Sequence, residues 1–301
     1  MRATLIYNPK SGTAASADEL VTSLSKIGWQ VDRCLPKKEL DDCLCHGTEV
    51  VVVAGGDGTV AKVAKRLAGT TVPMAVVPMG TANNIARSLG IGVDPAAAVL
   101  DLASATERRV DLGVVHGKME REYFVEGFGL GIFAHVLAER ARKKDKKPSR
   151  ALDLIADELE TYAARHVEIE VGGQDLSGNY LLVAVMNTRS LGPALGVAPE
   201  AKCDDGQLDL VLIRPEAKRS LLAHLRRAAE HGDVALPAFE TTRARRVRLA
   251  TTGWAHLDDE TRELGGKTVV EVAAGVVKLL ARSPRPRPNA VSARAPAAVA
   301  K

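Results

Sequence analysis

Two glycine-rich segments in the first third of the chain carry the residue types that could do chemistry. The first is Gly55-Gly56-Asp57-Gly58-Thr59, and the second is Pro78-Met79-Gly80-Thr81-Ala82-Asn83-Asn84-Ile85-Ala86. Each follows a short apolar run and precedes a helix-like pattern. Glycine lets backbone N–H groups turn toward an anion, and the start of a helix adds its positive dipole end. The pattern therefore predicts a phosphate-binding site.

Asp57 lies inside the first glycine turn, where a plain anion site would not favour a carboxylate. A carboxylate beside a phosphate implies either a Mg²⁺ ion or a proton to be moved. One glycine cluster alone would fit a simple strand-to-helix connection, whereas two together favour phosphate chemistry. The dinucleotide pattern Gly-x-Gly-x-x-Gly and the complete Walker loop are both absent from the sequence.

These segments, the early Asn8-Pro9-Lys10-Ser11-Gly12 run and the late Asp258-Asp259-Glu260 turn together resemble the diacylglycerol and sphingoid lipid kinases. The more distant relatives of that family are NAD kinases and 6-phosphofructokinases. The order and spacing of the motifs cover most of the chain. The resemblance implies an α/β N-terminal nucleotide-binding lobe with a parallel sheet, a mostly antiparallel β second lobe, and an active site in the cleft between the lobes.

The apolar pattern along the chain favours the same architecture. Up to Val115, strand-like runs alternate with helical patterns, which is typical of a parallel sheet covered by helices. Beyond that point strand-like runs dominate. We therefore expect a nucleotide-binding domain over residues 1–121, a β-rich lipid-substrate domain over residues 122–281 whose last segment returns to the first lobe, and a disordered basic tail over residues 282–301.

The expected strands and helices follow from these runs. The strands of the first part are Ala3–Tyr7, Gln30–Cys34, Val50–Ala54, Met74–Val77 and Arg109–Val115, and its helices are Ala17–Ile27, Val60–Leu67, Asn84–Leu89 and Ala96–Ala103. The later strands are Tyr123–Glu126, Val167–Val171, Tyr180–Met186, Leu208–Ile213, Arg245–Leu249 and Val269–Val272, with helices at Phe133–Arg142, Ala151–Ala164 and Leu221–Ala229.

Composition limits where such a protein works. The 301 residues are 46% hydrophobic and 26% charged, which suits two moderate cores. Apolar stretches are shorter than the roughly 18 to 20 residues of a membrane span. Four cysteines are too few for a disulfide framework. We expect a cytoplasmic protein that contacts the inner membrane face peripherally, and we leave a homodimer open.

The net charge of +4 resides in the C-terminal tail. From Arg282 onward there are five basic residues and no acidic ones, which leaves 36 basic and 37 acidic residues before it. The near-neutral body gives no reason to expect a nucleic-acid partner. An internal basic cluster from Arg140 to Arg150 is either a solvated loop or a surface that docks on anionic lipid head groups.

The resemblance also implies roles for single residues. Its nucleotide-binding positions fall on Asn8, Gly55, Gly56, Asp57, Gly58, Thr59, Thr81 and Glu260. Asp57 lies beside Mg²⁺–ATP as a catalytic residue, and Asp258 is the base for the acceptor hydroxyl. Asp205 is the candidate ligand of a structural Mg²⁺, and Asp111 matches an aspartate in a water-mediated Mg²⁺ network. From the residues alone, an acidic surface turn would be the favoured interpretation of Asp258-Asp259-Glu260, and the upstream motifs reverse that preference.

The chain departs from the family pattern at four positions. Ala61 and Lys62 replace a common Asn-Glu pair, Asn84 stands where aspartate is frequent, and Asp259 stands in the place of glycine. We expect an ATP- and Mg²⁺-dependent lipid kinase of phospholipid synthesis, with diacylglycerol as the favoured acceptor and phosphatidic acid as the product. A sphingoid-base or ceramide kinase, a NAD kinase, and a non-catalytic lipid or nucleotide sensor are the alternatives.

Overall fold

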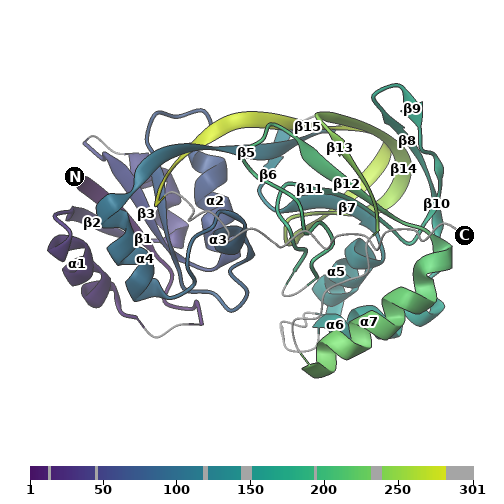
Figure 1. The fold of residues 1–301 in the computed structure, drawn as a ribbon, viewed down its shortest axis with the longest axis horizontal. Coiled ribbons are helices and arrows are strands. Elements are labelled where there is room, and N and C mark those ends of the chain that lie inside the picture. The colour runs from purple at the N-terminus through teal and green to yellow at the C-terminus, as the bar shows by residue number, and fades with distance from the viewer. Residues whose placement is uncertain are drawn as a thin grey trace, which may run out of the picture.

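The structure, a computed structural model, describes residues 1–12, 15–44, 47–117, 121–143, 151–192, 195–231 and 239–282. Two lobes lie side by side, with an α/β lobe formed by the N-terminal part of the chain and a β-rich lobe formed by the rest (Figure 1). The strands of the first lobe are parallel, and those of the second lobe are mainly antiparallel. The expected fold class is confirmed.

The first lobe is a parallel sheet with helices on both faces. Its strands are β1 (Arg2–Tyr7), β2 (Gln30–Pro36), β3 (Val50–Gly55) and β4 (Met74–Pro78). Its helices are α1 (Ala17–Lys26), α2 (Asp57–Leu67), α3 (Asn84–Ser88) and α4 (Pro95–Asp101), with 3₁₀ turns η1 (Lys37–Leu44) and η2 (Leu102–Ser104). Both β3 and β4 are buried along their whole length, as their unbroken apolar sequences predict.

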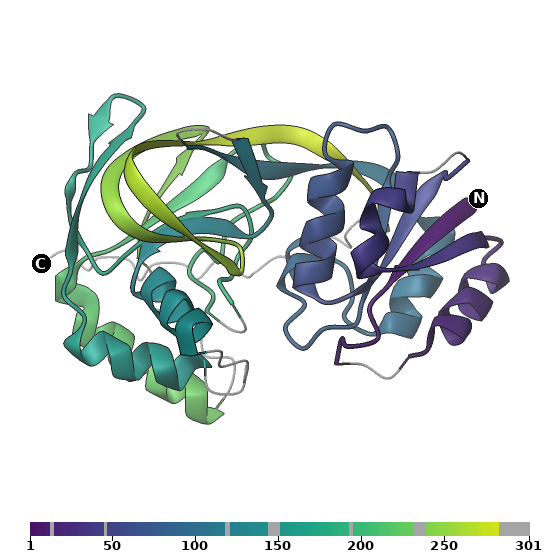
Figure 2. The ribbon, with the colours of Figure 1, turned by 180° about the vertical axis from the view of Figure 1, so that it is seen from behind.

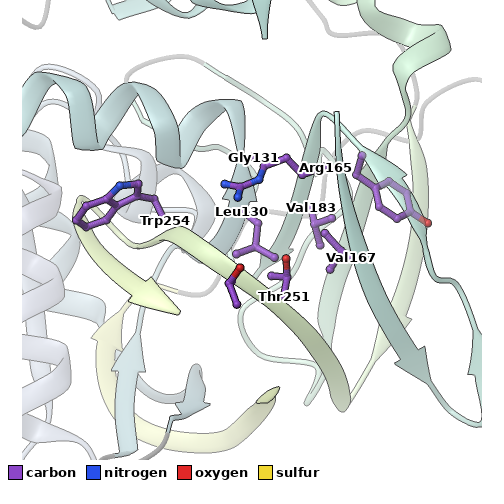
Figure 3. Close-up of a pocket in the computed structure, with 9 residues that line it drawn as sticks. Leu130, Gly131, Arg165, Val167, Val183, Thr251 and Trp254 are labelled. Atoms are coloured by element: carbon purple, nitrogen blue, oxygen red, sulfur yellow. The ribbon is translucent and has the colours of Figure 1, made fainter. Parts of the chain in front are cut away.

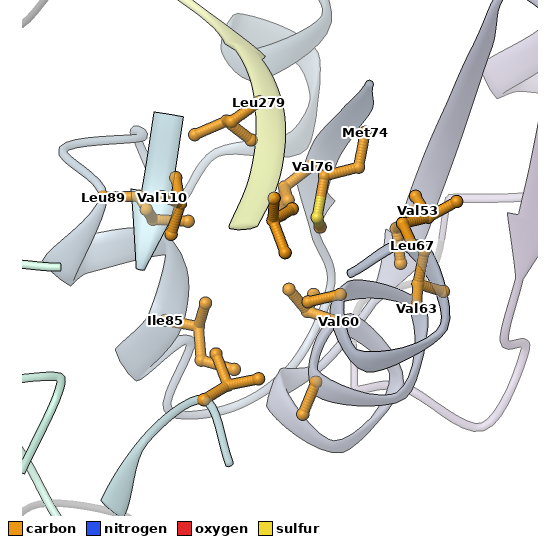
Figure 4. Packing of buried hydrophobic residues seen from close by; sticks show 14 of the residues in the cluster. Val53, Val60, Val63, Leu67, Met74, Val76, Ile85, Leu89, Val110 and Leu279 are labelled. Carbon is orange, nitrogen blue, oxygen red and sulfur yellow. The ribbon is translucent and has the colours of Figure 1, made fainter. Parts of the chain in front are cut away.

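The packing of α2 against the sheet fixes the first glycine turn at the edge of the lobe. Val60, Val63 and Leu67 on α2 face the sheet residues Val53 and Val76 in one buried cluster (Figure 4). The opposite face of the sheet is covered by α1 and α4. Since ligands of such sheets bind at the carboxyl ends of the strands, the turns that follow β1, β3 and β4 are where a site should form.

The second lobe contains the remaining strands and three helices. Its strands are β5 (Thr106–His116), β6 (Arg121–Phe124), β7 (Gly127–Gly131), β8 (Arg165–Val171), β9 (Gln174–Asp175), β10 (Gly178–Tyr180), β11 (Leu182–Met186), β12 (Leu208–Ile213), β13 (Glu240–Ala244), β14 (Arg246–Leu257) and β15 (Glu260–Ala281). The helices α5 (Ile132–Lys143), α6 (Ala151–Thr161) and α7 (Lys218–His231) gather below the strands, and a 3₁₀ turn, η4 (Pro215–Ala217), precedes α7 (Figure 2). Apolar side chains of these helices pack on β11 and β12.

Strand β15 joins the two lobes. It pairs with β14 and β5 in antiparallel fashion and then with β4 in parallel fashion, at Leu279 opposite Met74. Strands of both lobes are therefore hydrogen-bonded into one continuous sheet. The expected return of the chain to the first lobe is confirmed, and Figure 1 shows β15 running from one lobe into the other.

Several predicted features lie outside the described residues. These are the greater part of the basic cluster, at 144–150, and the C-terminal tail after Arg282. In the part of the chain that is described, Cys34 and Cys203 are free thiols. None of the described helices is long and apolar enough to cross a membrane.

Candidate active site

The two glycine turns touch each other through their backbones. A Cβ atom on Gly80 would lie 2.6 Å from the Cα atom of Gly56, and a Cβ on Gly56 would lie 3.1 Å from the Cα of Gly80. The N–H of Gly80 donates to Asn83 Oδ1 at 2.9 Å, which closes the second turn. A side chain at position 80 would collide with the backbone of Gly56, and one at position 56 would crowd the backbone of Gly80.

The Asn8 segment lies against the first glycine turn. Asn8 donates from its backbone N–H to the carbonyl of Ala54 at 3.0 Å and from Nδ2 to Thr59 Oγ1 at 3.2 Å. The N–H of Gly56 donates to Ser11 Oγ at 3.2 Å. Three loops that are distant in the sequence therefore form one backbone cradle at the carboxyl edge of the sheet. The structure brings Asn8, Gly56 and Thr59 together as predicted.

Asp57 is the first residue of α2 and connects the two turns. Its Oδ1 accepts the backbone N–H of Ile85, on α3, at 2.9 Å. Burial raises the pKa of the Asp57 carboxyl, while backbone N–H groups of Ile85 and Asn84 oppose that shift. A carboxylate held by the start of a second helix is fixed in direction, which a catalytic position needs.

Asp258 approaches the cradle from the second lobe. It occupies the tight turn between β14 and β15 with a φ of 54°, a left-handed conformation in which residues other than glycine are rare. Its carboxylate accepts the N–H of Glu126 at 2.7 Å and that of Val125 at 3.0 Å. Lys65 of α2 lies 2.6 Å from its other oxygen, so the turn is tied to the first lobe.

A cleft of about 300 Å³ lies between these groups. It is lined by Gly56, Asp57, Gly58, Ala61, Gly80, Thr81, Ala82, Asn84, Glu126, Arg140, Gly192, Asp258 and Asp259. The predicted residues Asp57, Thr81 and Asp258 thus share one space. The backbone of the glycine turns and the carboxylates of Asp57, Glu126, Asp258 and Asp259 therefore line the same cleft.

Glu260 lies on the outer side of the turn. Its Oε2 accepts a hydrogen bond from Arg262 Nη2 at 2.8 Å, and that hydrogen bond lowers the pKa of Glu260. Arg262 also binds Glu122 through two of its nitrogens. Glu260 does not line the cleft described above. Its contact with a nucleotide stays a prediction.

Glu126 is a cleft residue that the sequence analysis missed. Its side chain is 8% exposed, and its Oε1 has no hydrogen-bond partner among the described residues. Burial, together with the nearby charges of Asp57 and Asp258, raises the pKa of Glu126 well above its ordinary value, while a hydrogen bond with Asn84 opposes the rise. The available signal was one acidic residue inside the apolar run Phe124–Phe128.

Lys37, which lies near the start of α2, was also missed, and Lys62 was noted only as a departure from the family pattern. Lys37 Nζ would lie 3.8 Å from a Cβ on Gly58, and Asp259 Oδ2 would lie 3.3 Å from it. Burial, followed by the positive charge of Lys62, lowers the pKa of Lys37, and Asp259 opposes that shift. Positive charge at this end of the cleft suits an anionic ligand.

The predicted metal ligands, Asp111 and Asp205, do not line this cleft. Asp111 is buried and accepts the N–H groups of Gly206 at 2.7 Å and of Gly275 at 2.6 Å, one on each oxygen. Asp205 accepts the N–H of Gln207, and its Oδ2 lies 3.7 Å from Arg243 Nη1. Within the described residues, no three acidic, histidine or cysteine side chains converge on a metal position. The metal assignment therefore stays a prediction.

A small pocket lies in the second lobe between β7, β8 and β14 (Figure 3). Leu130, Val167 and Val183 form its apolar wall, and Trp254 stands at its edge, 43% exposed. Its volume of about 10 Å³ holds no more than a water molecule. An acyl chain would enter there only if the surrounding side chains moved.

Comparison with known proteins agrees with this geometry. The family model described as "Diacylglycerol kinase catalytic domain" matches residues 2–115, and that described as "YegS C-terminal NAD kinase beta sandwich-like domain" matches residues 127–281. A protein of Pseudomonas syringae pv. tomato described as "Probable lipid kinase YegS-like" is 30% identical over 77% of this chain and 77% of its own length. A diacylglycerol kinase of Mycobacterium tuberculosis is 27% identical over 84% of this chain and 86% of its own.

Solved structures show the same fold. A diacylglycerol kinase from Bacillus anthracis superposes with a TM-score of 0.69 at 19% identity, covering 93% of this chain and 96% of that one. Yeast NADH kinase, solved with NADH, gives a TM-score of 0.52 at 11% identity and covers 94% and 84% of the two chains. Because the two family models together span both lobes, the chain belongs to the lipid kinase family that combines a diacylglycerol kinase catalytic domain with a YegS-type C-terminal domain.

Proposed function

We propose that this protein transfers the γ-phosphate of ATP to the hydroxyl of a membrane lipid, with diacylglycerol as the acceptor and phosphatidic acid as the product. The observation that carries the proposal is the cleft in which the touching glycine turns of Gly56 and Gly80 face the carboxylates of Glu126 and Asp258. Phosphoryl transfer needs held phosphates and an oriented hydroxyl, and the glycine turns and the carboxylates supply these separately.

The donor end of the cleft suits a polyphosphate. Backbone N–H groups of the glycine turns and the N-terminus of α2 provide donors and a favourable dipole for anions. Lys37 and Lys62 add positive charge at the same end. Mg²⁺ enters as part of the Mg²⁺–ATP substrate, and Asp57 lies beside the phosphates. Asn8 supports the turn through its bond to Thr59.

The acceptor end suits a hydroxyl. Asp258 and Glu126 lie together there, with the N–H of Glu126 bound to the Asp258 carboxylate. We propose that this pair of carboxylates removes the proton of the hydroxyl as the bond to phosphorus forms. Removal of a proton by a positioned group contributes about two to four orders of magnitude in rate.

We propose that the acyl chains stay largely in the bilayer while the head of the lipid enters the cleft. Five charged residues line the cleft, and the pocket beside Trp254 has a volume of only about 10 Å³. The exposed indole of Trp254 lies on β14, the strand that leads into the Asp258 turn, so it is placed to contact lipid near the site. Peripheral contact with the membrane follows from such a substrate.

A transfer assay tests the proposal. Purified protein is incubated with γ-labelled ATP and detergent micelles that contain diacylglycerol, sphingosine or ceramide, with NAD as a soluble alternative acceptor. We expect labelled phosphatidic acid, and no label with the Asp57→Ala variant. Label only in NADP would identify a NAD kinase, and label only in a sphingoid product would move the substrate to that class. ATP binding without any transfer would favour the sensor.

A further inference from the structure

We propose that Lys65 is a positioning residue for phosphoryl transfer, because it holds the carboxylate of Asp258 at a fixed place relative to the phosphates of ATP. The inference rests on the proposed function, in which Asp258 takes part in removing the proton of the lipid hydroxyl. It assigns to Lys65 no contact with either substrate. Helix α2 then becomes the element that sets the distance between the phosphate donor and the base.

The ion pair between Lys65 and Asp258 links the two lobes beside the cleft. Lys65 Nζ lies 2.6 Å from Asp258 Oδ2, and the two side chains are 28% and 3% exposed. Lys65 belongs to α2 of the first lobe, whereas Asp258 belongs to the turn between β14 and β15 in the second lobe. Salt screens a partly buried ion pair less than an exposed one. The contact is therefore suited to fix the position of the turn.

The two oxygens of the Asp258 carboxylate are held from different lobes. Oδ1 accepts the backbone N–H of Val125 at 3.0 Å and of Glu126 at 2.7 Å, with that of Gly127 at 3.4 Å. Oδ2 is held by Lys65, and the N–H of Val125 lies farther from it, at 3.2 Å. Since a carboxylate oxygen has two lone pairs, Oδ2 is the oxygen with capacity left for a substrate hydroxyl. Lys65 thus orients the oxygen that would take the proton.

The face of α2 toward the β14–β15 turn carries two small residues and then the lysine. Gly58, Ala61 and Lys65 follow one another at a spacing that places them in a row along one side of a helix. Gly58 and Ala61 line the cleft, and Asp259 Oδ2 would lie 3.3 Å from a Cβ on Gly58. The small residues leave room for the turn to approach the helix. Lys65, one helical turn further along, then reaches the carboxylate of Asp258.

The same helix provides the phosphate end of the proposed site. Its N-terminus supplies backbone N–H groups and the positive end of the helix dipole. Lys65 lies about 10 Å along the helix axis from Gly58, and helical side chains lean toward the N-terminus, so the ammonium group is directed back toward that end. The buried side chains of Val60, Val63 and Leu67 pack α2 on the sheet. Because one rigid helix holds both the phosphates and the base, their separation is fixed.

The kinetic test compares wild type with Lys65→Met, Lys65→Arg and the control Lys26→Met. Methionine keeps an unbranched stem and removes the charge. Lys26 is an exposed residue at the end of α1 and does not line the cleft. In the lipid transfer assay we expect kcat of Lys65→Met to fall about 10- to 100-fold, because misplacement by about 1 Å can cost about 100-fold. Lys65→Arg keeps the charge and should be at least about threefold faster than Lys65→Met, and Lys26→Met should match wild type.

The affinity for ATP separates positioning of the base from damage to the fold. Titration calorimetry on the same preparations should give a dissociation constant for Lys65→Met within about threefold of wild type, since the glycine turns and the packing of α2 are unchanged. The assignment would be overturned by a loss of ATP affinity as large as the loss of kcat, or by retention of more than about half of the wild-type kcat in Lys65→Met. A Lys65→Arg variant no faster than Lys65→Met would also overturn it.

A double-mutant cycle tests whether Lys65 acts through Asp258. If the lysine only positions this carboxylate, Lys65→Met should change kcat by less than about twofold in an Asp258→Asn background, because the group that it positions is already gone. The same fold-loss in both backgrounds would overturn the inference while leaving the lipid kinase intact. Absence of lipid transfer by wild type would instead remove the proposed function, and the inference with it.

Discussion

At the scale of single residues, the cleft gathers negatively charged side chains, and hydrogen bonds or an ion pair hold some of them in place. Four carboxylates reach it, and backbone N–H groups or lysines hold at least two of them, Asp57 and Asp258. The contacts of Asn84 account for an asparagine at this position. Its amide donates to Gly192 and hydrogen-bonds Glu126, whereas an aspartate there would place a like charge against Glu126. The departure at position 84 thus matches the carboxylate at position 126.

Lys37 gives a prediction at this scale. Replacing it with methionine keeps the aliphatic stem and removes a half-buried charge beside the start of α2. We expect KM for ATP to rise about tenfold, equivalent to roughly 1.4 kcal/mol, with kcat nearly unchanged, because in the proposed function this charge attracts phosphate equally before and during transfer. Steady-state kinetics at varied ATP measures both constants.

Lys38→Met is the matched control for that experiment. Lys38 is the next residue in η1, and its side chain is 81% exposed. Lys38→Met should leave KM for ATP and kcat within about twofold of wild type, as expected for a solvated surface charge. Equal effects from the two substitutions would show that net charge alone, and not the position of Lys37, governs ATP binding.

At the scale of elements, the sequence predicted those parts whose local pattern is complete. The unbroken apolar runs of β3 and β4 and the glycine turns after them were identified because burial and turn chemistry are both local. β7 was missed, since three of the five residues in Gly127-Phe128-Gly129-Leu130-Gly131 are glycines, which are uncommon in strands. The length of β15 was missed because Gly265-Gly266 reads as a turn, although it lies within the ladder to β14.

Substitution of Gly113, on β5, tests the packing that holds the second lobe together. A Cβ at this position would lie 1.8 Å from Cζ of Phe124, a fully buried ring on the paired strand β6. We expect Gly113→Ala to lower the free energy of unfolding by about 1 to 3 kcal/mol, because the ring has to move within a packed core. Denaturant unfolding measures the change.

Gly92→Ala provides the comparison for Gly113→Ala. No atom outside the neighbouring residues lies within 4 Å of a Cβ placed on Gly92. That variant should change the free energy of unfolding by less than about 0.5 kcal/mol, as for other uncrowded surface sites. If Gly113→Ala were equally harmless, the described packing of β5 on β6 would be incorrect.

At the scale of the whole molecule, the active site exists only because the lobes are joined. Lys65 of the first lobe binds Asp258 of the second, and β15 runs through both. The sequence motifs predicted that Asp57 and Asp258 meet, but only through the resemblance to lipid kinases. Glu126 and Lys37 could not be found in that way, since their roles depend on which loops the fold brings beside the glycine turns.

The most direct measurement of the central claim is the turnover of Asp258→Asn compared with its affinity for ATP. The substitution is nearly isosteric and removes the charge that ties Lys65 and the Glu126 loop to the cleft, while the glycine turns stay intact. Titration calorimetry with ATP and the lipid transfer assay are applied to the same preparation. We expect the dissociation constant for ATP to stay within about threefold and kcat to fall by about two to four orders of magnitude. More than a tenth of wild-type turnover in Asp258→Asn would contradict the account.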